Sequence, residues 1–225
     1  MNQRELVMDF NLESLALGVK EYHYQNAITK LEIGERFNNC FFGASGEILT
    51  ECQIKAKEWA FQFKEGNKEK PFLLMVGTCG AGKTWAGISA LLHLAVTFRG
   101  WGGDKPDNWQ SQAFGRFHTH YQLAESVFRN DYAEENRRKM LETRVLMLDD
   151  LRAEGTGRVS ESLLAWMDEL INYRYNHNLA TIVTSNTTTE QFRATYGEKI
   201  VDRIQHAGIV LKVNSESLRK VKANA

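Results

Sequence analysis

The sequence predicts an α/β fold, in which a parallel sheet is covered by helices. Continuous apolar runs at residues 72–76 and 145–148, and a third run at 181–184 that is β-branched throughout, are typical of strands buried on both faces. A glycine-rich turn at 77–84 follows the first run and leads into a helical pattern. A long helical pattern at 160–176 precedes the third run. Strands and helices therefore alternate along the chain, as they do when parallel strands are joined by helices.

The most specific pattern is a phosphate-binding loop, because Gly77–Thr84 matches Gly-x-x-x-x-Gly-Lys-Thr at every specified position. The glycines allow a tight turn that points backbone N–H groups at phosphate oxygens. Lys83 brings a positive charge to the β- and γ-phosphates, and the Thr84 hydroxyl is a ligand for Mg²⁺. The order strand, loop, helix disfavours a glycine-rich turn without a nucleotide. The residues expected to hold the nucleotide are Gly77, Thr78, Cys79, Gly80, Ala81, Gly82, Lys83, Thr84 and Trp85.

Two stretches of helical character precede the first strand. Residues 1 to about 33 predict one or two short helices, which cannot form a core alone and must pack on the main domain or on a partner. Residues 50–65 form an apolar stripe at helical spacing. A glycine-rich break at 43–46 divides the chain into an N-terminal helical segment, 1–45, which is a candidate for partner binding, and a main domain, 46–225.

An insert at residues 99–109 follows the helix after the loop. It is rich in glycine and contains Trp101 and Trp109. Exposed tryptophans stack on bases or fill a partner's pocket, but they also fold back onto their own domain. The sequence favours neither alternative.

The next strand is expected at 113–118. Thr119 and Gln122 follow it with the spacing of a capping box, which predicts that a helix begins there and continues through Phe128.

Two acids form the second chemical pattern, because Asp149 and Asp150 end the apolar run at 145–148. Asp149 is expected to hold the magnesium shell, and Asp150 to orient the attacking water and accept its proton. Two adjacent carboxylates at a strand end repel each other without a cation, so the pattern favours a metal site.

The second half of the chain continues the alternation. Residues 160–176 predict a long amphipathic helix with Arg174 on its apolar side, and the last strand is expected at 209–213.

Asn186 is a further candidate site residue, because it ends the strand at 181–186. Ligands of open α/β sheets bind at the carboxyl ends of the strands. We expect Asn186 to hydrogen-bond the γ-phosphate or the attacking water. The alternative, a cap for the next helix, is disfavoured because Thr187 and Glu190 offer a cap of their own.

The composition is that of a globular chain. The 225 residues are 43% hydrophobic, and a formal net charge of +0 argues against broad, sequence-blind nucleic-acid binding but not against a local basic site. Three cysteines without metal-like spacing fit a reducing compartment. The chain has no apolar window of about 18 residues and no signal peptide, so we expect a cytoplasmic protein without a membrane partner.

Over residues 35 to 220 the order of motifs resembles the DnaC/DnaI helicase-loader branch of the AAA+ ATPases, with the IstB transposition ATPases as near relatives. The motifs are Gly77–Thr84, Val145–Leu151, Arg174-Tyr175, Thr181–Asn186, Asp202-Arg203-Ile204 and Ser217-Leu218-Arg219. The resemblance implies a P-loop fold of AAA+ type with a five-stranded parallel sheet and little or no C-terminal helical lid. It also implies ATP, Mg²⁺, a ring or spiral of subunits, single-stranded DNA, and a DnaB-like replicative helicase as partner.

The resemblance also implies roles for single residues. Lys83 and Thr84 match the Walker A pair, Asp149 the magnesium residue of Walker B, and Asn186 sensor 1. Asp150 stands where many AAA+ members have glutamate, and its shorter side chain predicts slow hydrolysis.

Two arginines match further functional positions of the family. Arg203 matches the arginine finger, which acts on ATP held by a neighbouring subunit, and Arg219 matches a sensor-2-like position. The loop departs from the family pattern, because Thr-Cys-Gly-Ala stands where Pro-Pro-Gly-Thr is usual and Trp85 where histidine is common.

Basic residues after the helix that begins near residue 120 lie where the family faces its central channel. One interpretation is that these residues contact DNA phosphates. The other is that they belong to a solvated helix in which they alternate with glutamates, and the sequence does not decide between the two interpretations. These residues are Arg129, Arg137, Arg138, Lys139 and Arg144.

The leading hypothesis is an ATP-dependent helicase loader. One alternative is an IstB-like transposition helper that binds duplex DNA and a transposase. A second is a nucleotide-switched helicase-binding protein with little hydrolysis, and a third, a small-molecule kinase, is disfavoured because no arginine-rich lid is evident.

Overall fold

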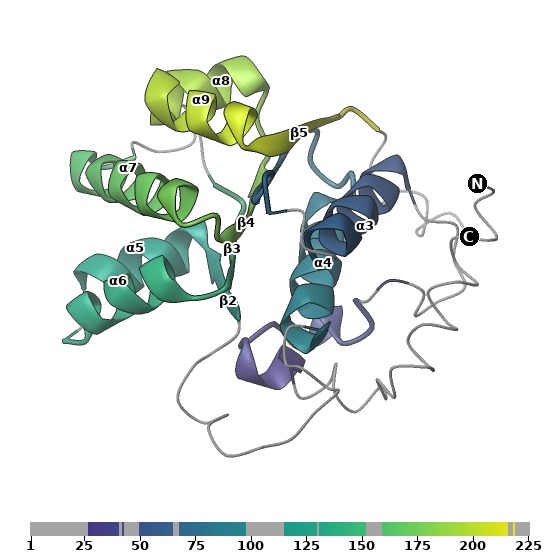
Figure 1. Cartoon of the computed structure of the whole chain (residues 1–225), viewed down its shortest axis with the longest axis horizontal. Coiled ribbons are helices and arrows are strands. Elements are labelled where there is room, and N and C mark those ends of the chain that lie inside the picture. The colour runs from purple at the N-terminus through teal and green to yellow at the C-terminus, as the bar shows by residue number, and fades with distance from the viewer. Residues whose placement is uncertain are drawn as a thin grey trace.

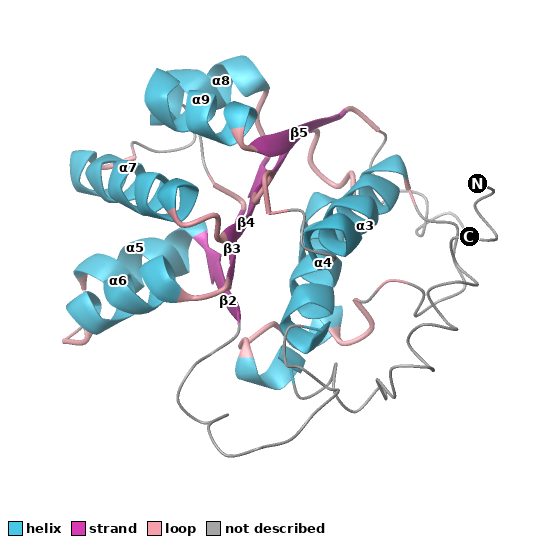
Figure 2. Ribbon diagram, viewed as in Figure 1, coloured by secondary structure: helices cyan, strands magenta, loops and turns pink. Residues whose placement is uncertain are grey.

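The computed structural model describes residues 27–40, 42, 50–64, 68–97, 115–129, 131–151, 159–215 and 218. In this part of the chain five parallel strands form one sheet with helices on both faces (Figures 1 and 2). The predicted five-stranded parallel sheet flanked by helices is therefore confirmed. The strands are β1 (Phe72–Gly77), β2 (Gly115–Thr119), β3 (Val145–Asp149), β4 (Ala180–Ser185) and β5 (Gly208–Val213).

The strand order β2-β3-β4-β1-β5 brings the sequence motifs to one edge of the sheet. Strand β1 lies between β4 and β5, and β3 lies on the far side of β4. Since all the strands are parallel, the carboxyl ends of β1, β3 and β4 meet at the same edge, where the loop, the two acids and Asn186 begin.

Helices cover the sheet in two layers (Figure 1). One face is covered by α3 (Glu51–Lys64), α4 (Lys83–Thr97) and residues 27–42 with their short 3₁₀ helix η1 (Glu35–Phe37). The other face carries a second set of helices. These are α5 (His120–Phe128), α6 (Ala133–Glu142), α7 (Glu161–Asn176), α8 (Thr189–Tyr196) and α9 (Glu198–His206).

Each face of the sheet has its own apolar core. Alternate residues of β1 divide between them, with Leu73 and Met75 in the cluster under α3 and α4, and Leu74 and Val76 in the cluster under α7 and α9. Burial on both faces explains why this strand is an uninterrupted apolar run in the sequence.

Residues 27–40 and 42 contribute to the first of these cores. Ile28, Leu31 and Phe42 are buried in the same cluster as α3 and α4. Within the predicted N-terminal helical stretch, residues 27–33 thus pack on the main domain, which is one of the two expected placements. Residues 1–26 and the tryptophan insert at 99–109 lie outside the described residues, and the division at residue 45 stays a prediction.

The predicted cap of α5 is confirmed. Thr119 caps the helix, and its side chain and Gln122 form both bonds of the capping box.

The predicted cap of α8 is wrong by one residue. Thr188, not Thr187, accepts from the Gln191 backbone N–H, and Gln191 completes the box. The Thr187 hydroxyl instead lies 2.9 Å from the Ser185 hydroxyl. Asn186 does not cap α8, as expected.

Arg174, predicted on the apolar side of its helix, is fully buried on α7. Its guanidinium donates to the carbonyls of Met140 (2.8 Å), Thr143 (2.8 Å) and Ala180 (2.6 Å), and so joins the end of α6 to the start of β4. Burial lowers its pKa to about 9. This arginine joins three elements, because neutral carbonyls and the Thr181 hydroxyl accept hydrogen bonds from all three nitrogens of a group that is costly to bury alone.

None of the described helices has the length and apolarity needed to cross a membrane.

Candidate nucleotide-binding site

The loop between β1 and α4 has the backbone that its glycines predict. Gly80 and Gly82 adopt φ of 82° and 87°, which L side chains rarely adopt. Gly77 has φ of 136° and lies against β5, so that a Cβ there would be 2.0 Å from the Val213 carbonyl oxygen. The turn and the close contact with β5 therefore both require glycine.

Lys83 closes the loop from inside. Its side chain is buried, and Nζ donates to the carbonyls of Gly77 (3.0 Å) and Thr78 (2.6 Å) and to Asn186 Oδ1 (2.8 Å). Burial lowers the pKa of this ammonium group below its ordinary value, and the nearby cysteine thiols and the carboxylates of Asp149 and Asp150 only partly offset this. The three acceptors hold the positive charge at the mouth of the loop, where phosphate oxygens would replace the carbonyls.

Asp149 lies at the end of β3 beside the start of α4. The Thr184 hydroxyl donates to Asp149 Oδ1 at 2.7 Å, and the Thr84 side chain lies near the same carboxylate. Burial raises the pKa of Asp149, and the Thr184 and Thr84 side chains partly offset this. A desolvated carboxylate next to a hydroxyl gains from a cation nearby.

These donors fit Mg²⁺. The described residues contain no group of three or more His, Cys, Asp or Glu that would hold a metal ion by themselves. Mg²⁺ in nucleotide sites takes one or two carboxylates, with substrate phosphates and waters as its other ligands. Thr84 and Asp149 supply such a partial set.

Asp150 and Asn186 continue the same cluster. Asp150 has φ of 54°, and its backbone N–H donates to the Thr184 hydroxyl at 2.9 Å. Asn186 Nδ2 donates to Asp150 Oδ1 at 2.5 Å, while Asn186 Oδ1 accepts from Lys83. One amide side chain thus bridges the ammonium group of the loop and the acid after β3.

The structure brings together five of the predicted site residues. A continuous set of hydrogen bonds runs from Lys83 through Asn186 and Asp150 to Thr184 and Asp149, and Thr84 lies next to Asp149. Thr184 was missed by the sequence reasoning. A hydroxyl at a buried position of a central apolar strand, two residues before Asn186, was the available signal.

The other predicted residues lie elsewhere. Arg203 is on α9, where Nη1 donates to Asp168 Oδ1 on α7, and no described hydrogen bond joins it to the cluster. Trp85 is on the first turn of α4, partly buried against the core, and its carbonyl accepts from the Cys40 thiol. Arg219 lies outside the described residues.

The three cysteines differ in accessibility. Cys79 is exposed in the loop, whereas Cys40 and Cys52 are buried. Burial raises the pKa of Cys40 to about 12 and that of Cys52 to about 11, so neither is a thiolate at neutral pH.

The chain after β5 returns to the loop, which the sequence reasoning did not foresee. Thr78 donates from its backbone N–H to the Val213 carbonyl (2.9 Å) and from its hydroxyl to the Ser215 carbonyl (2.8 Å). The Leu218 N–H donates to the Gly80 carbonyl at 3.0 Å. The start of the C-terminal segment therefore lies directly against the phosphate loop.

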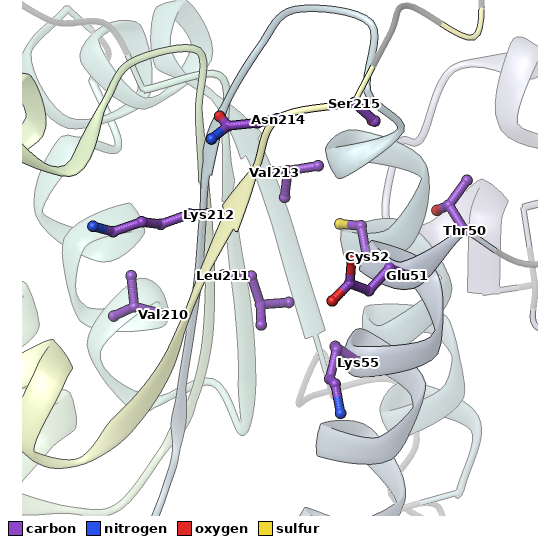
Figure 3. A pocket seen from close by; sticks show the side chains of 10 residues that line it. All are labelled: Thr50, Glu51, Cys52, Lys55, Val210, Leu211, Lys212, Val213, Asn214 and Ser215. Carbon is purple, nitrogen blue, oxygen red and sulfur yellow. The ribbon is translucent and has the colours of Figure 1, made fainter.

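A groove of about 380 Å³ lies between the first turns of α3 and the edge of β5 (Figure 3). Cys52, Glu51 and Leu211 point into the space between the two elements, whereas Lys212 points to the other side of the strand (Figure 3). Ser215 lines the groove and also binds Thr78, so the groove continues toward the loop.

The basic residues of α6 have partners within the chain. Arg137 Nε donates to the Val127 carbonyl at 3.1 Å, and its guanidinium lies over the Phe128 and Trp166 rings. These contacts favour a packing role for Arg137.

Two further basic residues form ion pairs along α6. Arg138 pairs with Glu142 at 3.2 Å and Lys139 pairs with Glu135. Of the two alternatives, the structure favours the solvated, interleaved helix at these positions.

Comparison with known families gives a match over residues 60–225 to the model of the IstB-like ATP binding protein family. No curated protein matches the chain.

Solved structures match as well. The DnaC helicase loader matches with a TM-score of 0.61 at 22% identity, over 80% of this chain and 100% of that one. DnaI matches with a TM-score of 0.56 at 21% identity, over 76% of this chain and 86% of that one. AMPPCP-bound DnaA from Aquifex aeolicus matches with a TM-score of 0.55 at 17% identity, over 79% of this chain and 52% of that one. At these identities the matches establish the fold, which is the expected P-loop fold of AAA+ type.

Proposed function

The chain belongs to the family of IstB-like ATP-binding proteins, and from this premise we propose that it is an ATPase that loads a replicative helicase onto single-stranded DNA during replication initiation. The observation that carries the ATPase part is the hydrogen-bonded set from Lys83 through Asn186 and Asp150 to Asp149. It joins the groups that a phosphoryl transfer to water needs.

In this proposal the loop residues Gly77–Trp85 bind the triphosphate, with Lys83 at the β- and γ-phosphates. Thr84 and Asp149 hold Mg²⁺, which neutralises charge on the phosphates when it is bound. Asp150 orients the attacking water and accepts its proton. Asn186 holds Asp150 in place and contacts the γ-phosphate or the water.

The nucleoside has a natural place in the groove between α3 and β5. The groove opens toward the loop at Ser215, and it combines apolar side chains such as Leu211 with the polar Glu51 and Thr50. A purine needs such a mixture of apolar contact and a few polar groups.

Assembly is the second part of the proposal. Arg203 reaches the ATP of a neighbouring subunit and makes a ring or spiral depend on nucleotide, and Arg219 acts as the sensor-2-like residue. The solved structures of similar fold include a DnaC helicase loader and a DnaA bound to AMPPCP and single-stranded DNA, which supports a helicase and single-stranded DNA as partners. The segment before residue 46 is proposed as the helicase-binding part.

A second candidate is an IstB-like transposition helper, which the family match itself favours. It uses the same ATP chemistry with a transposase and duplex DNA as partners. A third, a switch that hydrolyses little, is favoured by Asp150, because aspartate is shorter than glutamate and its carboxylate is bound by Asn186.

The test is a loading assay on circular single-stranded DNA with a DnaB-like helicase, the chain and ATP-Mg²⁺. The amount of helicase that stays on the circles after gel filtration is measured for the wild type and for Lys83→Ala. We expect the wild type to retain several-fold more helicase on the circles than Lys83→Ala does. Capture of a transposase on duplex DNA, with no helicase retained, would replace the loader by the transposition helper. ATP-dependent capture of helicase without turnover would establish the switch.

A further inference from the structure

We propose that Asp168 is a positioning residue that orients Arg203 toward the ATP of the neighbouring subunit. The proposal rests on the function proposed above for Arg203 and adds to it a residue for which neither the sequence nor the family match gives a role.

The contact is a single charge-assisted hydrogen bond between two helices. Arg203 Nη1 on α9 donates to Asp168 Oδ1 on α7 at 2.8 Å. The Arg203 side chain is 27% exposed and the Asp168 side chain 49% exposed. The pair therefore lies at the surface of the chain.

Both residues stand on elements that the core holds in place. On α7, Met167 and Ile171 near Asp168 are buried, and on α9 the neighbour Ile204 is buried in the same cluster. The positions of the two backbones are thus set by packing and not by the ion pair.

A second polar contact joins the same two helices. One turn further along α9, His206 Nδ1 lies 3.0 Å from the Tyr175 hydroxyl on α7. The Arg203–Asp168 and His206–Tyr175 contacts join the two helices on either side of Ile204, and together they limit how α9 can shift along α7.

The single bond leaves most of the guanidinium available. Arginine carries five N–H donors in a rigid fork, and the structure assigns one of them to Asp168. Among the described residues no other hydrogen-bond partner of the Arg203 guanidinium is found. A long side chain loses much freedom when it binds a phosphate, and anchoring one nitrogen removes part of that loss in advance.

Asp168 therefore acts through Arg203 and not on ATP itself. Its removal has little effect on folding, because a half-exposed ion pair contributes little to stability. Its removal is expected to affect turnover only when it is made in the subunit that supplies the arginine.

The experiment separates the two chains of one interface. Lys83→Ala chains supply Arg203 but cannot bind ATP, and Arg203→Ala chains bind ATP but lack the arginine, so a mixture restores part of the turnover. Asp168→Ala is then placed in one or the other chain. When Asp168→Ala is combined with Lys83→Ala in the same chain, we expect the restored turnover to fall about tenfold. When it is combined with Arg203→Ala in the same chain, we expect the restored turnover to stay unchanged.

Two further variants define the cause. Asp168→Asn keeps an oxygen acceptor at Oδ1 and is expected to retain most of the turnover in either chain. Glu198→Ala is the matched control, because it removes another surface ion pair of α9, with Arg193, without touching Arg203. It is expected to change nothing in either chain.

The outcomes distinguish the two levels of the proposal. If the plain mixture restores no turnover, the role of Arg203 fails, and the role of Asp168 fails with it. If the mixture restores turnover but Asp168→Ala has equal effects in both chains, Asp168 is merely structural and only this inference is overturned. Raised turnover with Asp168→Ala in the arginine-supplying chain would overturn it too, because the ion pair would then withhold Arg203.

Discussion

Replacing Asn186 by alanine tests the hydrogen-bonded set at the centre of the site. The variant removes the acceptor of Lys83 Nζ at 2.8 Å and the donor to Asp150 at 2.5 Å. Hydrogen bonds to charged groups contribute about 1.5–3 kcal/mol each. Since each 1.4 kcal/mol is about tenfold in rate, loss of one such bond in the transition state lowers kcat about 10- to 150-fold. Asn186 is exposed and its hydrogen bonds are screened by water, so we expect a loss at the lower end of this range, about tenfold, and not the product of two bonds.

The assay measures kcat for ATP, the affinity for a fluorescent ATP analogue and the midpoint of thermal unfolding. We expect nucleotide affinity to change by less than about threefold, because Lys83 and the loop backbone stay in place. The thermal midpoint should hardly move, since an exposed side chain is replaced. Asn186→Asp keeps the acceptor for Lys83 but sets a negative charge against Asp150, so its kcat should fall at least as far. An unchanged kcat in Asn186→Ala, or a loss of affinity as large as the loss of kcat, would refute the role given to Asn186.

The remaining predictions concern the metal residue, the loop thiol and the loop backbone. Burial raises the pKa of Asp149, so its ionised form is disfavoured in the folded state. Without Mg²⁺, the wild type therefore loses stability as the pH rises from the pKa of an unfolded aspartate, about 4, through the raised pKa of the folded state. Asp149→Asn should therefore unfold at a higher temperature than the wild type at pH 7 without metal and no longer respond to Mg²⁺; a lower unfolding temperature would contradict this. Cys79 is the exposed cysteine of the three, so a maleimide should label one thiol, block ATP binding and be slowed by ATP, with Cys79→Ala as the resistant control. Labelling of Cys79 that leaves ATP binding intact would contradict its place in the site. Gly77→Ala should lower the free energy of unfolding by about 3 kcal/mol or more in urea titrations, since φ is 136° and the Cβ would be 2.0 Å from a carbonyl oxygen of β5. Gly34→Ala, with nothing within 4 Å of the added Cβ, is the matched control, and equal effects of the two would contradict the geometry.

Local patterns were sufficient to predict most of the fold. The apolar run at 72–76 could be recognised because a strand buried on both faces has no polar alternation, and the cap at Thr119 because two side chains satisfy each other within four residues. The same rule failed at α8, where Thr187 and Thr188 both precede a suitable partner by three residues. The choice between them depends on the backbone after β4 and not on the residue types.

Long-range contacts could not be predicted in the same way. Nothing near Arg203 in the sequence indicates that it pairs with Asp168, 35 residues away, because the pair exists only after α7 and α9 pack together. Thr184 shows the same limit within the site, since its link to Asp149 depends on β3 and β4 being neighbours. The residues proposed to touch phosphate lie in recognisable sequence motifs, whereas nothing in the sequence near Thr184 or Asp168 indicates their partners.

The central claim is that the chain is an ATPase whose site is completed by a second subunit. ATP turnover per subunit, measured over a wide range of protein concentration for the wild type and Arg203→Ala, tests it most directly. We predict that wild-type turnover per subunit rises with concentration to a plateau, more steeply with single-stranded DNA, and that Arg203→Ala stays low throughout. Flat turnover per subunit, with Arg203→Ala equal to the wild type, would contradict the account.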